Sequence, residues 1–87
     1  MDKKIGQGLT IFILDDEKDI CYFIKEFFVK RGFDVFTAMT GQASISLLKK
    51  VDPDIALLDI QLAKGDMEGL DVLKYIKENR PKCHCVM

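Results

Sequence analysis

The sequence predicts an α/β fold in which helices cover both faces of a doubly wound parallel sheet. Apolar runs of strand length recur along the chain, segments of helical periodicity separate them, and the resulting order is β-α-β-α-β-α-β. Such alternation is typical of parallel strands joined by right-handed crossovers. The 87 residues suffice for one domain. We expect residues 1–8, which are polar with two glycines, to form a flexible lead-in and 9–87 to form the fold.

The first strand is expected at residues 10–14, because TIFIL is a continuous apolar run suited to a strand covered on both faces. A helix is expected from Glu17 onward, where the spacing of apolar residues changes to that of one helical face, and Gly32 is a natural stop. We expect its apolar stripe to face the core, with a partner groove formed by Phe23, Phe27 and Phe28 as the alternative. The stripe comprises Ile20, Phe23, Ile24, Phe27 and Phe28.

The second strand is expected at 33–38, FDVFTA. Thr40 is suited to cap a second helix that runs to about Lys50, because its hydroxyl can accept a hydrogen bond from the first helical turn. Asp52-Pro53 then ends that helix, since the residue before a proline avoids helical geometry. The residues of this helix that we expect to face inward are Ala43, Leu47 and Leu48.

The third strand is expected at 54–60, DIALLDI, and a loop with two glycines at 62–69. A third helix at 70–80 is followed by Pro81, and the composition of 83–87, CHCVM, favours a fourth strand. The inward residues expected on the third helix are Leu70, Leu73, Tyr75 and Ile76.

Composition narrows the function classes. Apolar residues make up 48%, charged residues 31%, and the net charge is −1, so no basic excess indicates nucleic acid or an anionic membrane. No apolar run approaches the ~20 residues that span a bilayer, and the N-terminus lacks the apolar core of a signal peptide. We therefore expect a cytoplasmic protein with no membrane partner.

The three cysteines, Cys21, Cys83 and Cys85, are odd in number and irregularly spaced, so reduced thiols are expected rather than a disulfide framework. Cys83-His84-Cys85 could also indicate a metal site. On a strand, however, the two cysteines would point one way and His84 the other, so we favour packing.

Acidic residues stand where two of the expected strands end. Asp15 and Asp16 follow the first strand and Asp59 lies at the end of the third. If these strands are neighbours, three carboxylates converge at one edge of the sheet, which is where open parallel sheets bind ligands. Mg²⁺ would offset their repulsion, since it prefers carboxylate and carbonyl oxygens, and a carboxylate beside it can attack a phosphoryl group. The alternative is helix capping and loop solvation, with Asp16 as a cap.

With the acidic pair in ILDDE, the stretch TAMTGQASISLLKKVDPDIALLDI and the helix GLDVLKYIKENRP, the chain resembles the receiver domain of two-component response regulators from about residue 9 to 87. The resemblance implies a flavodoxin-like (CheY-like) fold with strand order 2-1-3-4-5. It implies a domain that is not itself an enzyme and that accepts a phosphoryl group from the phosphohistidine of a sensor histidine kinase.

The resemblance also implies roles for single residues. Asp59 matches the phosphoacceptor. Asp16 matches the acid that binds Mg²⁺ directly, and Asp15 the acid that acts through metal-bound water. Gln61 matches the position whose backbone carbonyl completes the protein's share of the metal shell.

The chain departs from the family pattern in three ways. Ala63 stands where a proline is usual, four residues after the acceptor, and the glycine that opens the third helix comes two residues late, as Gly69. The hydroxyl residue that ends the family's fourth strand and the lysine that ends its fifth are absent from this chain. We therefore interpret it as a receiver domain truncated at the C-terminus, lacking the last helices and the fifth strand and impaired in phosphotransfer.

Loss of the fifth strand would leave the fourth as a bare edge, and loss of the last helix would uncover apolar surface beside the first. Both features favour association, so we expect a homodimer or higher assembly, with segment exchange as one form of it. Two alternatives to phosphotransfer stay open. One is a receiver-shaped interaction module, and the other is a Mg²⁺-dependent hydrolase of the aspartyl-phosphate type.

Overall fold

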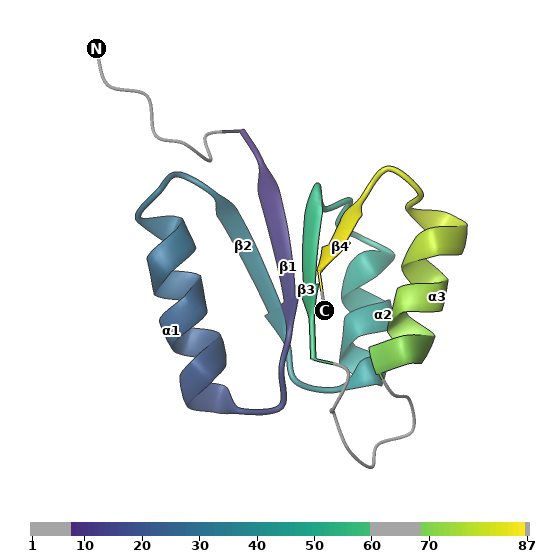
Figure 1. The fold of residues 1–87 in the computed structure, drawn as a ribbon, viewed down its shortest axis with the longest axis horizontal. Helices are drawn as coiled ribbons and strands as arrows, with labels where there is room; N and C mark the ends of the chain where they lie inside the picture. Colours follow the sequence, from purple (N-terminus) through teal and green to yellow (C-terminus); the bar gives the residue numbers. More distant parts are fainter. Residues whose placement is uncertain (1–7, 60–68, 87) are drawn as a thin grey trace.

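The computed structural model describes residues 8–59 and 69–86 and shows a parallel sheet between two helical layers (Figure 1). The expected alternation of strands and helices is confirmed, with boundaries that shift by one or two residues. Residues 1–7 of the expected lead-in, Ile60 of the expected third strand, residues 61–68, which include most of the loop expected at 62–69, and Met87 lie outside the described residues. The elements are β1 (Thr10–Leu14), α1 (Lys18–Val29), β2 (Asp34–Ala38), α2 (Gly41–Leu48), β3 (Ile55–Leu58), α3 (Gly69–Asn79) and β4 (His84–Val86).

The strands lie in the order β2-β1-β3-β4, and all neighbouring pairs are parallel. This agrees with the expected strand order as far as the described residues reach. β1 is the central strand with partners on both sides, Leu14 standing opposite Ala38 of β2 and Leu58 of β3. The carboxyl ends of three strands therefore meet at one edge of the sheet.

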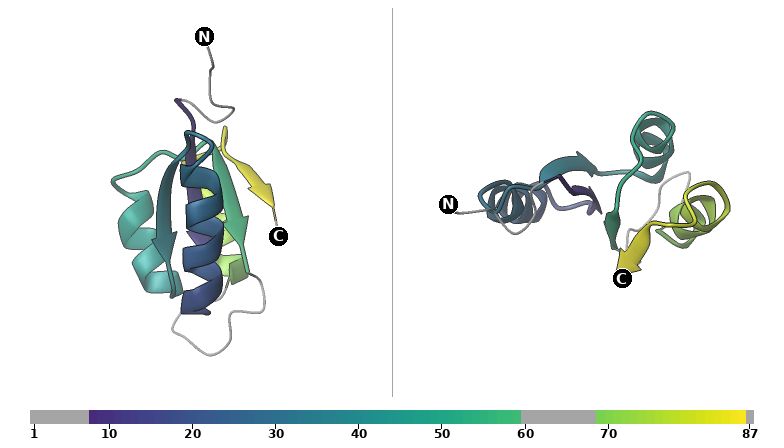
Figure 2. Two further views of the ribbon diagram at one scale, coloured as in Figure 1. Left: turned by 90° about the vertical axis from the view of Figure 1, so that its left-hand side faces the viewer. Right: turned by 90° about the horizontal axis from the view of Figure 1, so that it is seen from above.

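The sheet separates two apolar clusters. Helix α1 covers one face over β2 and β1, while α2 and α3 cover the other face (Figure 2). Side chains of β1 alternate between the clusters, Ile11 and Ile13 toward α1 and Phe12 and Leu14 toward α2 and α3. All four are fully buried, which explains why this strand reads as a continuous apolar run.

Helix α1 buries a narrower face than its sequence suggests. Its core contacts come from Cys21, Ile24 and Phe28, so the inward orientation expected for Ile20, Phe23 and Phe27 is wrong. Phe23 is 76% exposed. The apolar stripe of this helix is wider than the part of the helix surface that contacts the sheet. Only the residues on the side facing the strands, which are spaced three and four apart, reach them. The chain leaves the helix through Gly32, whose φ of 92° favours glycine.

Helix α2 begins as expected. The Thr40 hydroxyl accepts a hydrogen bond from the Ala43 backbone N–H at 3.1 Å, which satisfies one free donor of the first turn. The inward orientation expected for Ala43 is wrong, since Ser44 is buried in its place. Ser44 tolerates burial because its hydroxyl donates to the Thr40 carbonyl at 2.8 Å.

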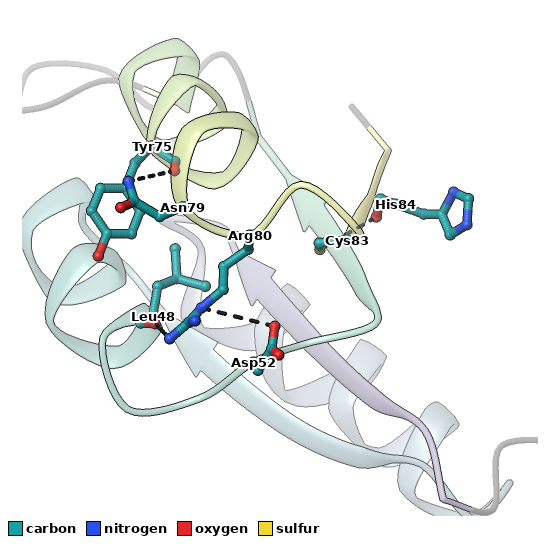
Figure 3. A network of polar contacts seen from close by, with 7 residues as sticks. All are labelled: Leu48, Asp52, Tyr75, Asn79, Arg80, Cys83 and His84. Carbon is teal, nitrogen blue, oxygen red and sulfur yellow. Dashed lines mark hydrogen bonds and ion pairs between the residues drawn. The ribbon is translucent and has the colours of Figure 1, made fainter.

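Helix α3 buries Val72 and Ile76, while Leu70, expected to face inward, is 57% exposed. The helix end is tied to the α2–β3 connection by Arg80 (Figure 3). Its guanidinium donates to the Leu48 carbonyl at 2.9 Å and lies 3.8 Å from the Asp52 carboxylate.

Candidate functional site

Backbone hydrogen bonds hold the acidic residues at the carboxyl edge of the sheet. The Asp59 N–H donates to the Leu14 carbonyl at 2.9 Å, and the Asp15 N–H donates to the Ala38 carbonyl at 3.2 Å. These bonds carry the sheet ladder one residue beyond the ends of β1 and β3. Asp15 and Asp59 therefore leave the sheet side by side, as expected from their positions after neighbouring strands.

The turn between β1 and α1 is stabilised by Asp15. One of its carboxylate oxygens accepts a hydrogen bond from the Glu17 N–H at 2.9 Å, a local arrangement typical of aspartate. The N-cap of α1 is Glu17, and that cap makes no side-chain hydrogen bond. The alternative that Asp16 caps the helix is thus wrong, because the helix begins one residue later than this role requires. Asp16 is exposed at the mouth of the site.

One carboxylate oxygen from each of Asp15, Asp16 and Asp59 lies within 4.8 Å of the other two. Asp15 and Asp59 are half-buried and Asp16 is exposed. Oxygens at this separation can bind one cation placed between them, and an all-carboxylate set suits a hard ion such as Mg²⁺. Gln61, the fourth residue expected at the metal, lies outside the described residues.

Cys21 lies beneath this turn and was not recognised as part of the site from the sequence. Its Sγ donates to the Asp15 carbonyl at 3.2 Å, and its side chain is buried. Burial, reinforced by the charge of Asp15, raises the pKa of the Cys21 thiol, which keeps the proton that the hydrogen bond needs. The sequence offered one signal that could have identified Cys21, namely its position one turn into α1 on the side that faces β1.

An apolar groove of about 340 Å³ runs beside the acidic residues. Asp15 and Asp59 line this groove. Its other lining residues are apolar and include Ile24 from α1, Leu57 from β3 and Val86 from β4. The carboxylates therefore face water on one side and an apolar wall on the other.

The Cys83-His84-Cys85 segment lies apart from this site. The two cysteines pack on the α3 side of the sheet, whereas His84 points away from it (Figure 3). This confirms the expected alternation along a strand and the packing role of the cysteines. Burial is the largest of the causes that raise the pKa of Cys83 to about 12.

Among residues 8–59 and 69–86, no helix combines the length and apolar character needed to cross a bilayer.

Comparison with known proteins places this geometry in a family. The model of the response regulator receiver domain matches residues 11–87. The probable transcriptional regulatory protein TcrX of Mycobacterium tuberculosis is 31% identical over 81 residues, covering 93% of this chain and 34% of the relative. Sporulation initiation phosphotransferase F of Bacillus subtilis is 34% identical over 67 residues, covering 77% of this chain and 52% of the relative. The chain thus spans between a third and about half of these relatives.

Solved structures of response regulators also match this chain. NtrX from Brucella abortus superposes with a TM-score of 0.86 at 27% identity, over 93% of this chain and 18% of NtrX. One chain in a crystal structure of histidine kinase ThkA in complex with the response regulator TrrA matches with a TM-score of 0.76 at 25% identity, over 88% of this chain and 65% of that chain.

Proposed function

Because the chain belongs to the response regulator receiver family, we propose that it accepts a phosphoryl group on Asp59 from a phosphohistidine of a sensor histidine kinase. The observation that carries this proposal is the convergence of Asp15, Asp16 and Asp59 within 4.8 Å at the carboxyl edge of the sheet. The structural match to one chain of a kinase–regulator complex supports a histidine kinase as the partner.

The residues suggest how the transfer would proceed. A carboxylate oxygen of Asp59 attacks phosphorus while the bond to the donor nitrogen breaks, and the imidazole leaves with the bonding electrons and takes up a proton. The product is an acyl phosphate on Asp59. Asp59 is suited to act as the nucleophile because its backbone N–H donates a hydrogen bond to the Leu14 carbonyl. This bond holds the residue at the end of the strand, so that its carboxylate starts from a fixed position.

A divalent cation is the cofactor of this proposal. Asp15, Asp16 and Asp59 would hold Mg²⁺, with the backbone carbonyl of Gln61 as a further ligand. When bound, Mg²⁺ supplies positive charge that offsets the charge of the incoming phosphoryl oxygens.

Two other functions make different predictions. An interaction module of receiver shape would bind partners without gaining a phosphoryl group. A hydrolase of the aspartyl-phosphate type would turn over a phosphate ester, which needs acid–base groups beyond the three carboxylates. Donor and acceptor must also share a compartment, so the cytoplasmic location is part of the main proposal.

The test is the intact mass of the protein after incubation with acetyl phosphate, a small-molecule phosphoryl donor, with and without Mg²⁺. We expect a gain of about 80 Da, one phosphoryl group, that requires Mg²⁺ and is lost in Asp59→Asn. Asp34→Asn is the matched control, because Asp34 is an exposed acid at the opposite edge of the sheet. No gain in the wild type, or an equal gain in Asp59→Asn, would contradict the proposal.

A further inference from the structure

The turn between β1 and α1 carries two of the three carboxylates of the site, and its conformation decides where they point. These are Asp15 and Asp16, and the turn lies at the lower end of the sheet in Figure 1. Asp16 is exposed, so its direction depends on the backbone that carries it. Carboxylates bind a cation more tightly when their oxygens are held in place before the ion arrives.

Hydrogen bonds hold four consecutive peptide groups of this turn. The Asp15 N–H donates to the Ala38 carbonyl at 3.2 Å, and the Glu17 N–H donates to the Asp15 carboxylate at 2.9 Å. The Cys21 N–H donates to the Glu17 carbonyl at 3.0 Å, and the Cys21 Sγ donates to the Asp15 carbonyl at 3.2 Å. Cys21 therefore holds the turn through its backbone and also through its side chain.

The bond from the thiol acts on the peptide group that joins the two acids. The Asp15 carbonyl and the Asp16 N–H belong to one planar unit, so a rotation of that plane would change the direction of both side chains. Cys21 itself is only 5% exposed and belongs to the core cluster of Ile11 and Ile13. The thiol thus ties the orientation of this peptide group to the packed core.

The thiol is available as a donor at neutral pH. Burial is the largest of the causes that raise the pKa of Cys21, so the sulfur keeps its proton. A thiol is a weak donor. Its loss would nevertheless take this partner away from a part-buried Asp15 carbonyl, which is unfavourable for a polar group.

We propose that Cys21 is a positioning residue of the metal site, whose thiol fixes the peptide group between Asp15 and Asp16 and thereby raises the affinity of the carboxylates for a divalent cation. This inference rests on the proposed metal site and extends it to a residue that does not touch the ion. Groups that orient metal ligands typically change metal affinity about 10–100-fold when they are substituted. A weak donor should lie near the lower end of that range.

The Kd for Mg²⁺ measures this role, and the chain offers a matched control. Mg²⁺ titrations followed through the amide chemical shift of Asp59 give the Kd. Cys21→Ala should raise it at least about fivefold. Cys83→Ala should leave it within about twofold, because Cys83 is as buried as Cys21, at 6% exposure, but packs in the cluster on the other face of the sheet.

Two further variants separate the hydrogen bond from packing. Cys21→Ser keeps a donor and should stay within about twofold of the wild-type Kd. Cys21→Val fills the space of the thiol without a donor and should match Cys21→Ala. Circular dichroism melts verify that every variant is folded at the temperature of the titration.

Amide hydrogen exchange in EDTA gives a readout that needs no metal. Cys21→Ala should speed exchange of the Glu17 N–H at least about fivefold, because the turn opens more often. The Ser44 N–H, which donates to the Thr40 carbonyl at the start of α2, should exchange at the wild-type rate.

The outcomes separate this inference from the proposed function. Equal Mg²⁺ affinity of the wild type and Cys21→Ala overturns the inference and leaves the metal site standing. A Cys21→Ser variant as weak as Cys21→Ala, or a Cys83→Ala variant weakened equally, also overturns it, because packing would then account for the loss. A wild type that binds no Mg²⁺ overturns the inference together with the metal site on which it rests.

Discussion

Neutralising one carboxylate of the cluster should stabilise the metal-free protein and abolish its response to Mg²⁺. Two unit charges within 4.8 Å of each other repel by at least about 0.9 kcal/mol in water and by at least about 3.5 kcal/mol at an effective dielectric constant of 20. Because Asp16 is exposed, the lower figure applies to each of its two neighbours. Asp16→Asn should therefore raise the free energy of unfolding by about 1–2 kcal/mol and the Tm by roughly 4–15 °C.

Mg²⁺ should reverse this order. At 100 times its Kd, a ligand that binds only the folded state adds about 2.7 kcal/mol, so the wild type should melt above Asp16→Asn once Mg²⁺ is saturating. Thermal melts in EDTA and across a Mg²⁺ series measure both effects, with Asp34→Asn as the control that keeps the cluster. A wild-type Tm indifferent to Mg²⁺, or an equal stabilisation by Asp34→Asn, would refute the reasoning.

The remaining predictions concern the fold. Thr40→Ala removes the hydroxyl that caps α2 and should lower the unfolding free energy by about 1 kcal/mol in urea titrations; no loss would mean that the cap contributes nothing. Ile76→Ala, at a fully buried site, should cost about 2–5 kcal/mol in the same assay, whereas Leu70→Ala, at an exposed one, should stay within about 0.5 kcal/mol, and equal losses would contradict the packing of α3. Above pH 9 an unfolded chain releases the Cys83 proton that the folded protein keeps, because the folded pKa is about 12, so the Tm should fall as pH rises from 9 toward 11. The Tm of Cys83→Ala should fall less steeply with pH, and parallel Tm curves for the two proteins would contradict the raised pKa of Cys83.

The strand framework could be predicted from the sequence because its signals are local. Residues 11–14 of β1, IFIL, are all apolar because β1 is central and covered on both faces, and Thr40 caps α2 through bonds within one turn. The convergence of Asp15, Asp16 and Asp59 also followed, since parallel neighbouring strands must end at the same edge.

Helix orientation could not be predicted as well. The apolar stripe of α1 is broad, and which part of it contacts the sheet depends on how the helix lies over β1 and β2. Tertiary packing, and not the local sequence, therefore determines that Cys21 is buried in the core while Phe23 is exposed. Ser44 was missed for a related reason, since a hydroxyl can be buried once it bonds to the preceding turn. The hydrogen bond from Cys21 to the Asp15 carbonyl could not be predicted either. The distance between these two residues depends on the conformation of the turn between β1 and α1.

The most direct test of the central claim is to locate the phosphoryl group. Borohydride reduces an aspartyl phosphate to homoserine, so treatment of the acetyl-phosphate-modified protein, followed by digestion and peptide mass spectrometry, identifies the residue that carried it. We expect homoserine at position 59 and an unchanged residue at positions 15 and 16, because Asp59 is the proposed nucleophile and the other two are proposed metal ligands. Homoserine at another aspartate, or none in protein that has gained the phosphoryl mass, would contradict the assignment of Asp59.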